Sequence, residues 1–257
     1  MSSPRFVWDD RVKRYRYLSS GRFVSQAVVD KLTRLSISQV KKDLRTIGQL
    51  LIDGKINLAA WEQETALALK VLHVQTYTLH KGGAANMTAT DYSLIEQALR
   101  EEFQYLHNFA VDIYEGRVSQ AQFKARLGNY AKKSRYSAEL ARRELAFESN
   151  SGYAKRFLGP TDRSCGECLY YASLGLQPIG ILPLPTQKCS CRSNCLCSIK
   201  YYDSQDVEGV GLASWSWLFF ALDLSRSNNL LNAIWTNRSS CSLDSCSAKN
   251  NNSSAVR

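Results

Sequence analysis

The stretch over residues 165–197 decides how this chain is organised. It opens with Cys165-Gly-Glu-Cys168, continues through a proline-containing segment of 20 residues and closes with Cys189-Ser-Cys191-Arg-Ser-Asn-Cys195-Leu-Cys197. Six of the eight cysteines therefore lie within 33 residues. Two thiolates separated by two residues on a tight turn can bind one metal ion, so Cys165 and Cys168 predict one half of a metal site.

A structural zinc site needs four thiolate or imidazole ligands in a tetrahedron that leaves no position for water. The spacing of the four later cysteines does not single out the second pair. We predict a zinc ion bound by Cys165, Cys168, Cys195 and Cys197. Cys191 is the first substitute in the second half of the site, and Cys189 remains a further candidate. Zinc binding would contribute on the order of 10 kcal/mol to folding this loop-rich segment.

Two other uses of the thiols remain open. Disulfide bonds would need an oxidising compartment, whereas the N-terminus lacks the apolar centre of a secretory signal peptide and favours the cytosol. An iron–sulfur cluster would use the same cysteines, but no redox motif accompanies them. Three basic residues, Arg163, Lys188 and Arg192, are expected to stabilise the thiolates. Cys241 and Cys246 stand apart in a Ser/Asn-rich segment and are predicted to be free thiols.

Ahead of the cysteines, apolar residues recur at steps of three and four, the period of amphipathic helices. The first expected helix begins at residue 25 and ends near residue 54, and three more cover about 57–80, 90–115 and 119–147. Gly54 and Gly116 follow apolar helix ends, and Asn57 and Ser119 can cap the helices that come next. Such connections are typical of helical hairpins, so an antiparallel bundle is predicted.

These patterns predict a mainly α-helical fold in four segments. A basic, aromatic arm precedes the helical bundle, which is followed by a small cysteine-rich α+β module held by zinc and by a partly disordered tail. The segments cover residues 1–24, 25–154, 155–203 and 204–257. A strand over 198–203 is expected to close the module. In the tail, the apolar run 212–224 is either a docking peptide or a helix packed on the bundle.

The net charge of +10 is concentrated in two places. Residues 1–24 hold six Arg and Lys against two Asp, and residues 155–200 hold six against one Asp and one Glu. Positive surfaces of this kind favour polyanions, so DNA is a candidate partner. Aromatic residues alternate with the basic ones in the arm, where they either stack on bases or anchor the arm on the helices. The anchoring residues would be Phe6, Trp8, Tyr15, Tyr17 and Phe23.

The sequence offers little for catalysis. Its histidines, His73, His80 and His107, lack a glutamate three residues before them, so the Glu-x-x-His signature of a di-iron bundle is missing. The chain also lacks the Gly-x-Ser-x-Gly, His-Glu-x-x-His and Gly-rich phosphate-binding motifs. We predict a protein that is not an enzyme.

The order of these features resembles the head-morphogenesis, or minor head, proteins of tailed bacteriophages, the Mu F-like group. The likeness is carried by a helical region, then Asp162-x-x-Cys165-x-x-Cys168, a Gly/Pro-rich loop and Cys195-x-Cys197 before a β-prone end, and is strongest over residues 155–203. The family usually closes this motif with His-Pro-x-Cys-x-Cys. Here Arg192-Ser193-Asn194 precede Cys195, so the histidine is absent and Cys191 is the residue that could take its role.

The resemblance implies a virion protein present in few copies and associated with the portal or the inside of the head. Its partners would be the portal and major capsid proteins, with DNA contacted through basic surfaces, and it would act in head assembly and in DNA packaging or delivery. During assembly it would be found in the host cytoplasm. Neither a membrane span nor a small-molecule substrate is expected. The alternative is a zinc protein that binds nucleic acid outside any virion.

Overall fold

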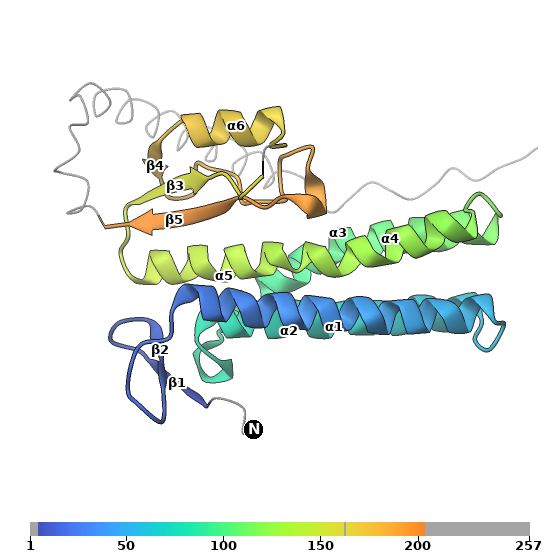
Figure 1. Ribbon diagram of the computed structural model, residues 1–257, viewed down its shortest axis with the longest axis horizontal. Helices are drawn as coiled ribbons and strands as arrows, with labels where there is room; N and C mark the ends of the chain where they lie inside the picture. The colour runs from blue at the N-terminus through green and yellow to red at the C-terminus, as the bar shows by residue number, and fades with distance from the viewer. Residues whose placement is uncertain (1–4, 162, 204–257) are drawn as a thin grey trace, which may run out of the picture. The chain divides into compact units, whose positions relative to one another are not determined.

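Long helices form the bundle that the apolar spacing predicts. The computed structural model describes residues 5–161 and 163–203. Three helices lie close to their predicted bounds: α1 (Gln26–Ile52), α2 (Leu58–Lys81) and α3 (Ala89–Tyr114). Figure 1 shows α1 and α2 side by side, and a short 3-10 helix, Ala84–Asn86, links α2 to α3.

The helix predicted over residues 119–147 is instead two helices, α4 (Gln120–Lys133) and α5 (Arg135–Glu148), separated at Ser134. Ser134 is buried, and its hydroxyl donates a hydrogen bond to the carbonyl oxygen of Ala131 at 2.9 Å. A serine that bonds back to the preceding turn competes with the helical backbone and bends the helix. The apolar period continues across this break, so spacing alone does not reveal it.

The predicted capping residues are confirmed. Gly54 and Gly116 have left-handed φ angles of 66° and 69°, which glycine adopts without a Cβ clash. The Asn57 side chain accepts a backbone N–H of the first turn of α2 at 2.8 Å. Ser119 and Gln122 form a reciprocal capping box at the start of α4. These local interactions fix where each helical hairpin turns.

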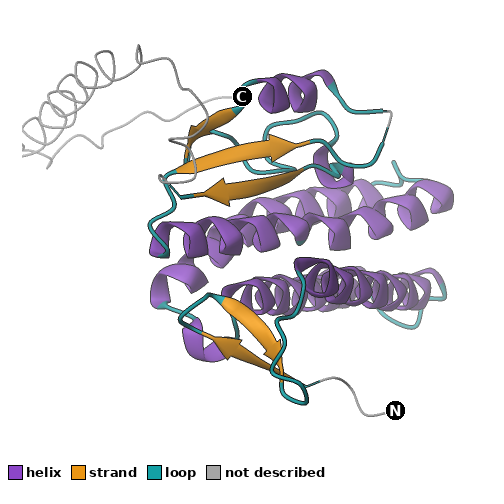
Figure 2. Cartoon of the chain, turned by 60° about the vertical axis from the view of Figure 1, so that its left-hand side comes forward, coloured by secondary structure: helices purple, strands orange, loops and turns teal. Residues whose placement is uncertain are grey.

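A small antiparallel sheet follows α5, as expected for the cysteine-rich module. Its order places β3 (Tyr153–Phe157) between β4 (Leu176–Pro178) and β5 (Ser198–Tyr202), and β5 is the predicted closing strand. Helix α6 (Gly166–Ser173) connects β3 to β4. The sheet lies between α6 and α5 (Figure 1 and Figure 2). A 3-10 helix, Arg192–Asn194, precedes β5.

The bundle and the module share one apolar core. Side chains from α2, α3 and α5 pack in it against four buried residues of the module, Ala154, Leu182, Leu184 and Ile199. Two other buried clusters, around Trp61 and around Leu44, consist of bundle residues alone. The module is therefore anchored on the bundle by apolar packing, and the predicted boundary after residue 154 falls inside β3. The predicted tail, with its apolar run and last two cysteines, lies outside the described residues.

The N-terminal arm is a hairpin of β1 (Phe6–Asp9) and β2 (Arg14–Tyr17). It turns over residues 10–13, and a turn at Ser20-Gly21 makes a second reversal that brings Phe23 beside β2. Of the helices in the described ranges, none combines the length and apolarity that crossing a bilayer requires.

Two of the five aromatic side chains named for anchoring, Trp8 and Tyr15, hold this hairpin on the end of α2, which agrees with the anchoring alternative for the arm. The Trp8 ring packs on Gly82, where an added Cβ would lie 2.3 Å from its Cε2 atom. The Tyr15 hydroxyl donates a hydrogen bond to the carbonyl oxygen of Leu79 at 3.0 Å. Gly82 also caps α2 with a φ angle of 100°, so a single glycine both ends the helix and admits the indole.

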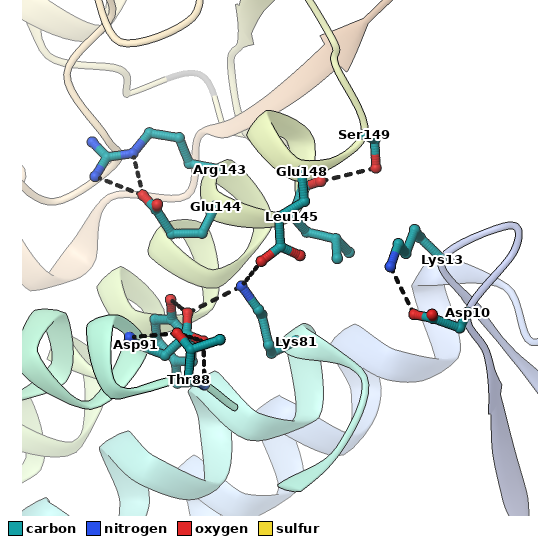
Figure 3. Close-up of polar contacts among 11 residues, drawn as sticks. Asp10, Lys13, Lys81, Thr88, Asp91, Arg143, Glu144, Leu145, Glu148 and Ser149 are labelled. Atoms are coloured by element: carbon teal, nitrogen blue, oxygen red, sulfur yellow. Dashed lines mark hydrogen bonds and ion pairs between the residues drawn. The ribbon is translucent and has the colours of Figure 1, made fainter. Parts of the chain in front are cut away.

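An ionic network with a buried Lys81–Asp91 pair ties together the ends of three helices (Figure 3). Lys81 Nζ at the end of α2 lies 3.1 Å from Asp91 Oδ1 on α3 and 2.7 Å from Glu148 Oε1 on α5. Tyr77 and Thr88 donate further hydrogen bonds to the Asp91 carboxylate. The pKa of Lys81 is raised, because the bonds to Glu148 and Asp91 outweigh burial, which alone would lower it.

A buried histidine on α2 is expected to make stability depend on pH. Arg142 Nε donates to His80 Nδ1 at 3.3 Å, and His80 Nε2 lies 2.9 Å from the Thr33 hydroxyl, so the contacts suit the neutral ring. Burial, with the Arg142 charge added, lowers the pKa of His80 to about 3 from 6.5. As pH falls from about 6.5 towards 3, His80 is therefore protonated in the unfolded chain but stays neutral in the folded chain. Stability should fall over this window by up to about 1.4 kcal/mol per pH unit.

Urea unfolding of the wild type and of His80→Gln between pH 7 and pH 4 measures this contribution. The difference in unfolding free energy between the two proteins should shift in favour of the variant as pH falls. His107→Gln is the matched control, because the His107 side chain is exposed. A difference that does not change with pH would contradict a neutral, buried His80.

Candidate metal centre

The module gathers six cysteines from two segments of the chain. Cys165 caps the N-terminus of α6 and Cys168 lies in its first turn. The other four lie between β4 and β5: Cys189, Cys191, Cys195 and Cys197. Because α6 and β5 both contact β3, the sheet brings the two segments together. All six are free thiols, of which Cys168 and Cys195 are buried and the rest half-buried.

The sulfur atoms form two groups that overlap at Cys168. Within each group all Sγ atoms lie within 4.8 Å of one another: Cys165, Cys168, Cys189 and Cys191 in the first, and Cys168, Cys195 and Cys197 in the second. Cys168 Sγ lies 3.9 Å from Cys191 Sγ and 3.7 Å from Cys195 Sγ. Four sulfurs bound to one zinc ion at about 2.3 Å would be about 3.8 Å apart. The thiols thus have the spacing of a tetrahedral metal site.

The four predicted ligands all belong to this cluster, but they do not form one group of four. Cys165 groups with Cys189 and Cys191, which the sequence placed second to Cys195 and Cys197. Cys195 and Cys197 share a group with Cys168 but not with Cys165. The spacing of the cysteines along the chain could not show which of them group with Cys165, because the turn over residues 189–195 folds back onto α6.

A buried arginine beside the sulfurs is the feature that the sequence did not reveal. Arg156 of β3 is 1% exposed, and its Nη2 atom lies 3.5 Å from the Sγ atoms of both Cys168 and Cys195. Its Nη1 atom donates to the carbonyl oxygen of Pro183 at 2.9 Å. The pKa of Arg156 is raised, because the neighbouring thiols, Cys197 foremost, outweigh burial, which alone would lower it. A buried cation at this place suits a cluster with negative charge.

The basic residues that the sequence suggested as thiolate partners, Arg163, Lys188 and Arg192, are instead exposed. The sequence could have indicated Arg156 through the alternating sides of a strand, because Ala154 and Arg156 are the two buried positions of β3. A charged residue at an inward position of a strand needs a partner of opposite charge, and the cysteines supply it.

The thiols differ in how readily they ionise. The pKa of Cys165 falls to about 6: burial opposes the shift, but hydrogen bonds from the Cys191 thiol and from backbone N–H groups outweigh it. The pKa of Cys168 rises, first because the side chain is buried and then because other thiols surround it. An entering metal ion would therefore meet one thiolate that is largely formed at neutral pH, at Cys165.

Gly159 keeps the second group of sulfurs in place. A Cβ at this position would lie 2.4 Å from Leu196 Cβ and 2.5 Å from the Leu196 carbonyl oxygen, so Gly159→Ala must displace the residue between Cys195 and Cys197. We expect a loss of about 1–3 kcal/mol in stability, together with weaker metal retention. Competition with a chelator measures how strongly the Gly159→Ala variant retains the metal. Gly166→Ala is the matched control, since nothing lies within 4 Å of its Cβ position; equal behaviour of the two variants would contradict the prediction.

A serine, a histidine and a glutamate also meet inside the bundle. His73 Nδ1 lies 2.8 Å from Ser137 Oγ, and His73 Nε2 lies 2.8 Å from Glu102 Oε2, without the alignment of a hydrogen bond. The order of contacts is that of a catalytic triad. All three side chains are buried, with Ser137 at 0% exposure, so in this arrangement they join α2, α3 and α5 and present no nucleophile to solvent.

Neither a protein-family model, nor a curated protein, nor a solved structure matches this chain. The resemblance to minor head proteins therefore rests on the residues of the cysteine segment and on their place after the helices. The geometry by itself supports a cysteine cluster that can hold a metal ion, attached to a helical bundle.

Proposed function

We propose that the cysteine cluster binds Zn²⁺ as a structural staple. An all-thiolate tetrahedron is the donor set of structural zinc sites, and the sulfur spacing fits its dimensions. Cys168 and Cys195 are buried and Arg156 packs against both, which suits a closed site without a position for substrate. When bound, zinc supplies metal–sulfur bonds that tie α6 to the segment before β5. The apolar side chains of the sheet then hold the module on α5.

The whole chain acts, in this proposal, as a minor head protein of a tailed phage. It is held in the virion by portal and major capsid proteins and takes part in head assembly and in DNA packaging or delivery, with no catalytic step. The observation that carries this function is the helical body followed by Cys165-x-x-Cys168 and Cys195-x-Cys197, two motifs that meet in one cluster. Exposed aromatic side chains on α3, Tyr105 at 64% and Tyr114 at 83%, offer surface for protein partners.

Mass spectrometry of purified particles and of procapsids tests this function. The chain is expected in few copies in at least one of the two fractions, and crosslinking is expected to join it to portal or major capsid protein. Particles assembled with Cys168→Ser should contain less of the chain if the staple shapes the contact surface. Absence of the wild-type chain from both fractions would contradict the proposed function.

The second candidate is a zinc protein that binds nucleic acid outside any virion. The observation in its favour is the net charge of +10, concentrated in the arm and in the module. Against it, the arm uses its groups internally: Arg16 Nε lies 2.6 Å from Asp9, and its guanidinium lies 3.8 Å from the centre of the Phe23 ring. Affinity for DNA that falls steeply with salt in the isolated chain, without capsid association, would favour this candidate.

A further inference from the structure

The cluster holds more thiols than one zinc ion needs. One tetrahedral ion uses four sulfurs, so a single site would leave two of the six cysteines without a metal. The two groups of sulfurs contain four and three members and share Cys168. One further sulfur in the second group would complete a second tetrahedron.

Cys189 is placed to supply that sulfur. Its Sγ atom lies within 4.8 Å of Cys168 Sγ, the sulfur that both groups share. Two backbone hydrogen bonds, from Arg192 N–H to the Cys189 carbonyl oxygen and from Cys195 N–H to the Arg192 carbonyl oxygen, fold the segment that joins Cys189 to Cys195 of the second group. Cys168 has neighbours on both sides, with Cys191 at 3.9 Å and Cys195 at 3.7 Å. Cys168 therefore lies between the two groups, and Cys189 lies next to it as a member of the first group. The outer members are Cys165 and Cys191 on one side and Cys195 and Cys197 on the other.

We propose that the cluster binds two Zn²⁺ ions bridged by the sulfurs of Cys168 and Cys189. Two tetrahedral ions need eight ligand positions, and six sulfurs fill them when two of the six bridge. One ion is held by the outer pair Cys165 and Cys191, and the other by Cys195 and Cys197. This inference rests on the zinc binding proposed above and extends it from one ion to two.

Charge is compatible with the second ion. One divalent ion with four thiolates and two divalent ions with six thiolates carry the same net charge of two negative units. The second Zn²⁺ enters as two remaining thiols release their protons to solvent, so the charge facing the buried Arg156 stays the same. The arrangement also gives every cysteine in the described segment a ligand role.

Native mass spectrometry of the full-length chain, purified under reducing conditions with zinc, counts the ions. Cys241 and Cys246 are first replaced by serine, so that the six clustered cysteines are the only thiols. Two zinc ions per chain are expected. One ion per chain would overturn the bridged pair and leave the structural staple standing, whereas a chain that folds without metal would overturn both.

Two further measurements locate the ions. In the same background, Cys197→Ser should reduce the count from two to one, while a lone site at Cys165, Cys168, Cys189 and Cys191 would keep its single ion in that variant. Because a substituted chain could misfold, cadmium-113 NMR is also recorded on the chain with all six cysteines present. Two resonances in the range of all-sulfur coordination are expected, and a single resonance would contradict the bridged pair.

Discussion

Replacing Cys168 with serine is expected to unfold the cysteine module and to leave most of the helical bundle folded. Cys168 belongs to both groups of sulfurs, so its loss removes a ligand from every metal site that the cluster can form. A structural zinc site contributes on the order of 10 kcal/mol, more than a module with so small a sheet can supply from its own core. The buried clusters around Trp61 and Leu44 contain no module residue and should persist.

Hydrogen exchange followed by mass spectrometry measures this effect segment by segment. In Cys168→Ser, and in the wild type treated with a strong chelator, protection should disappear from β3, β4 and β5 and weaken in α5, whose apolar face the sheet covers. Protection should remain in α1 and α2. Cys241→Ser is the control for loss of a thiol outside the cluster. Unchanged protection of the sheet in Cys168→Ser would show that the module folds without the Cys168 ligand.

Replacing Lys81 with methionine is expected to cost about 3–5 kcal/mol of stability, because it breaks a buried ion pair. Methionine keeps most of the side-chain volume, but it leaves the Asp91 carboxylate, 2% exposed, without its cation. The pKa of Asp91 is lowered in the folded protein: burial would raise it, but hydrogen bonds from Tyr77, Thr88 and Lys81 outweigh burial. The stability that Asp91 contributes is therefore present above pH 3.8 and lost as pH falls through its lower, folded pKa.

Chemical denaturation at pH 7 checks the size of this effect. Lys70→Met is the matched control, because Lys70 lies on the same helix and is exposed, and it should change stability by less than about 0.5 kcal/mol. The double variant Lys81→Met/Asp91→Asn should recover part of the loss, since it also removes the stranded carboxylate charge. Equal stabilities of Lys81→Met and Lys70→Met would contradict a role for this network in joining α2, α3 and α5.

The sequence predicted the features of the fold that depend on neighbouring residues. Apolar spacing and the pairs Gly54 with Asn57 and Gly116 with Ser119 determined where helices begin and end, because capping acts within one turn. The helix break at Ser134 was not predicted, because it depends on one hydroxyl that bonds back to the carbonyl oxygen of Ala131. The sheet was foreseen only at β5, because β3 and β4 are short and owe their pairing to residues far away in the chain.

In the cysteine cluster, too, the sequence predicted only the contacts between residues that are close together in the chain. Cys165 and Cys168 sit on one turn of α6, so their spacing alone placed them together. The choice among the later four depended on how the loop before β5 folds back, which no local pattern encodes. Arg156 is nine residues from the nearest cysteine in sequence and reaches the sulfurs only because β3 lies between the two segments. The buried contact of His73 with Ser137 likewise joins residues 64 positions apart.

X-ray absorption at the zinc edge of the purified full-length chain tests whether the cysteine cluster is a closed zinc–thiolate staple. Zinc is expected to be present, and each ion is expected to have four sulfur neighbours at about 2.3 Å, with no nitrogen or oxygen ligand. A shell that includes nitrogen or oxygen would mean an open or mixed site. Protein that is folded, reduced and free of zinc would contradict the staple itself.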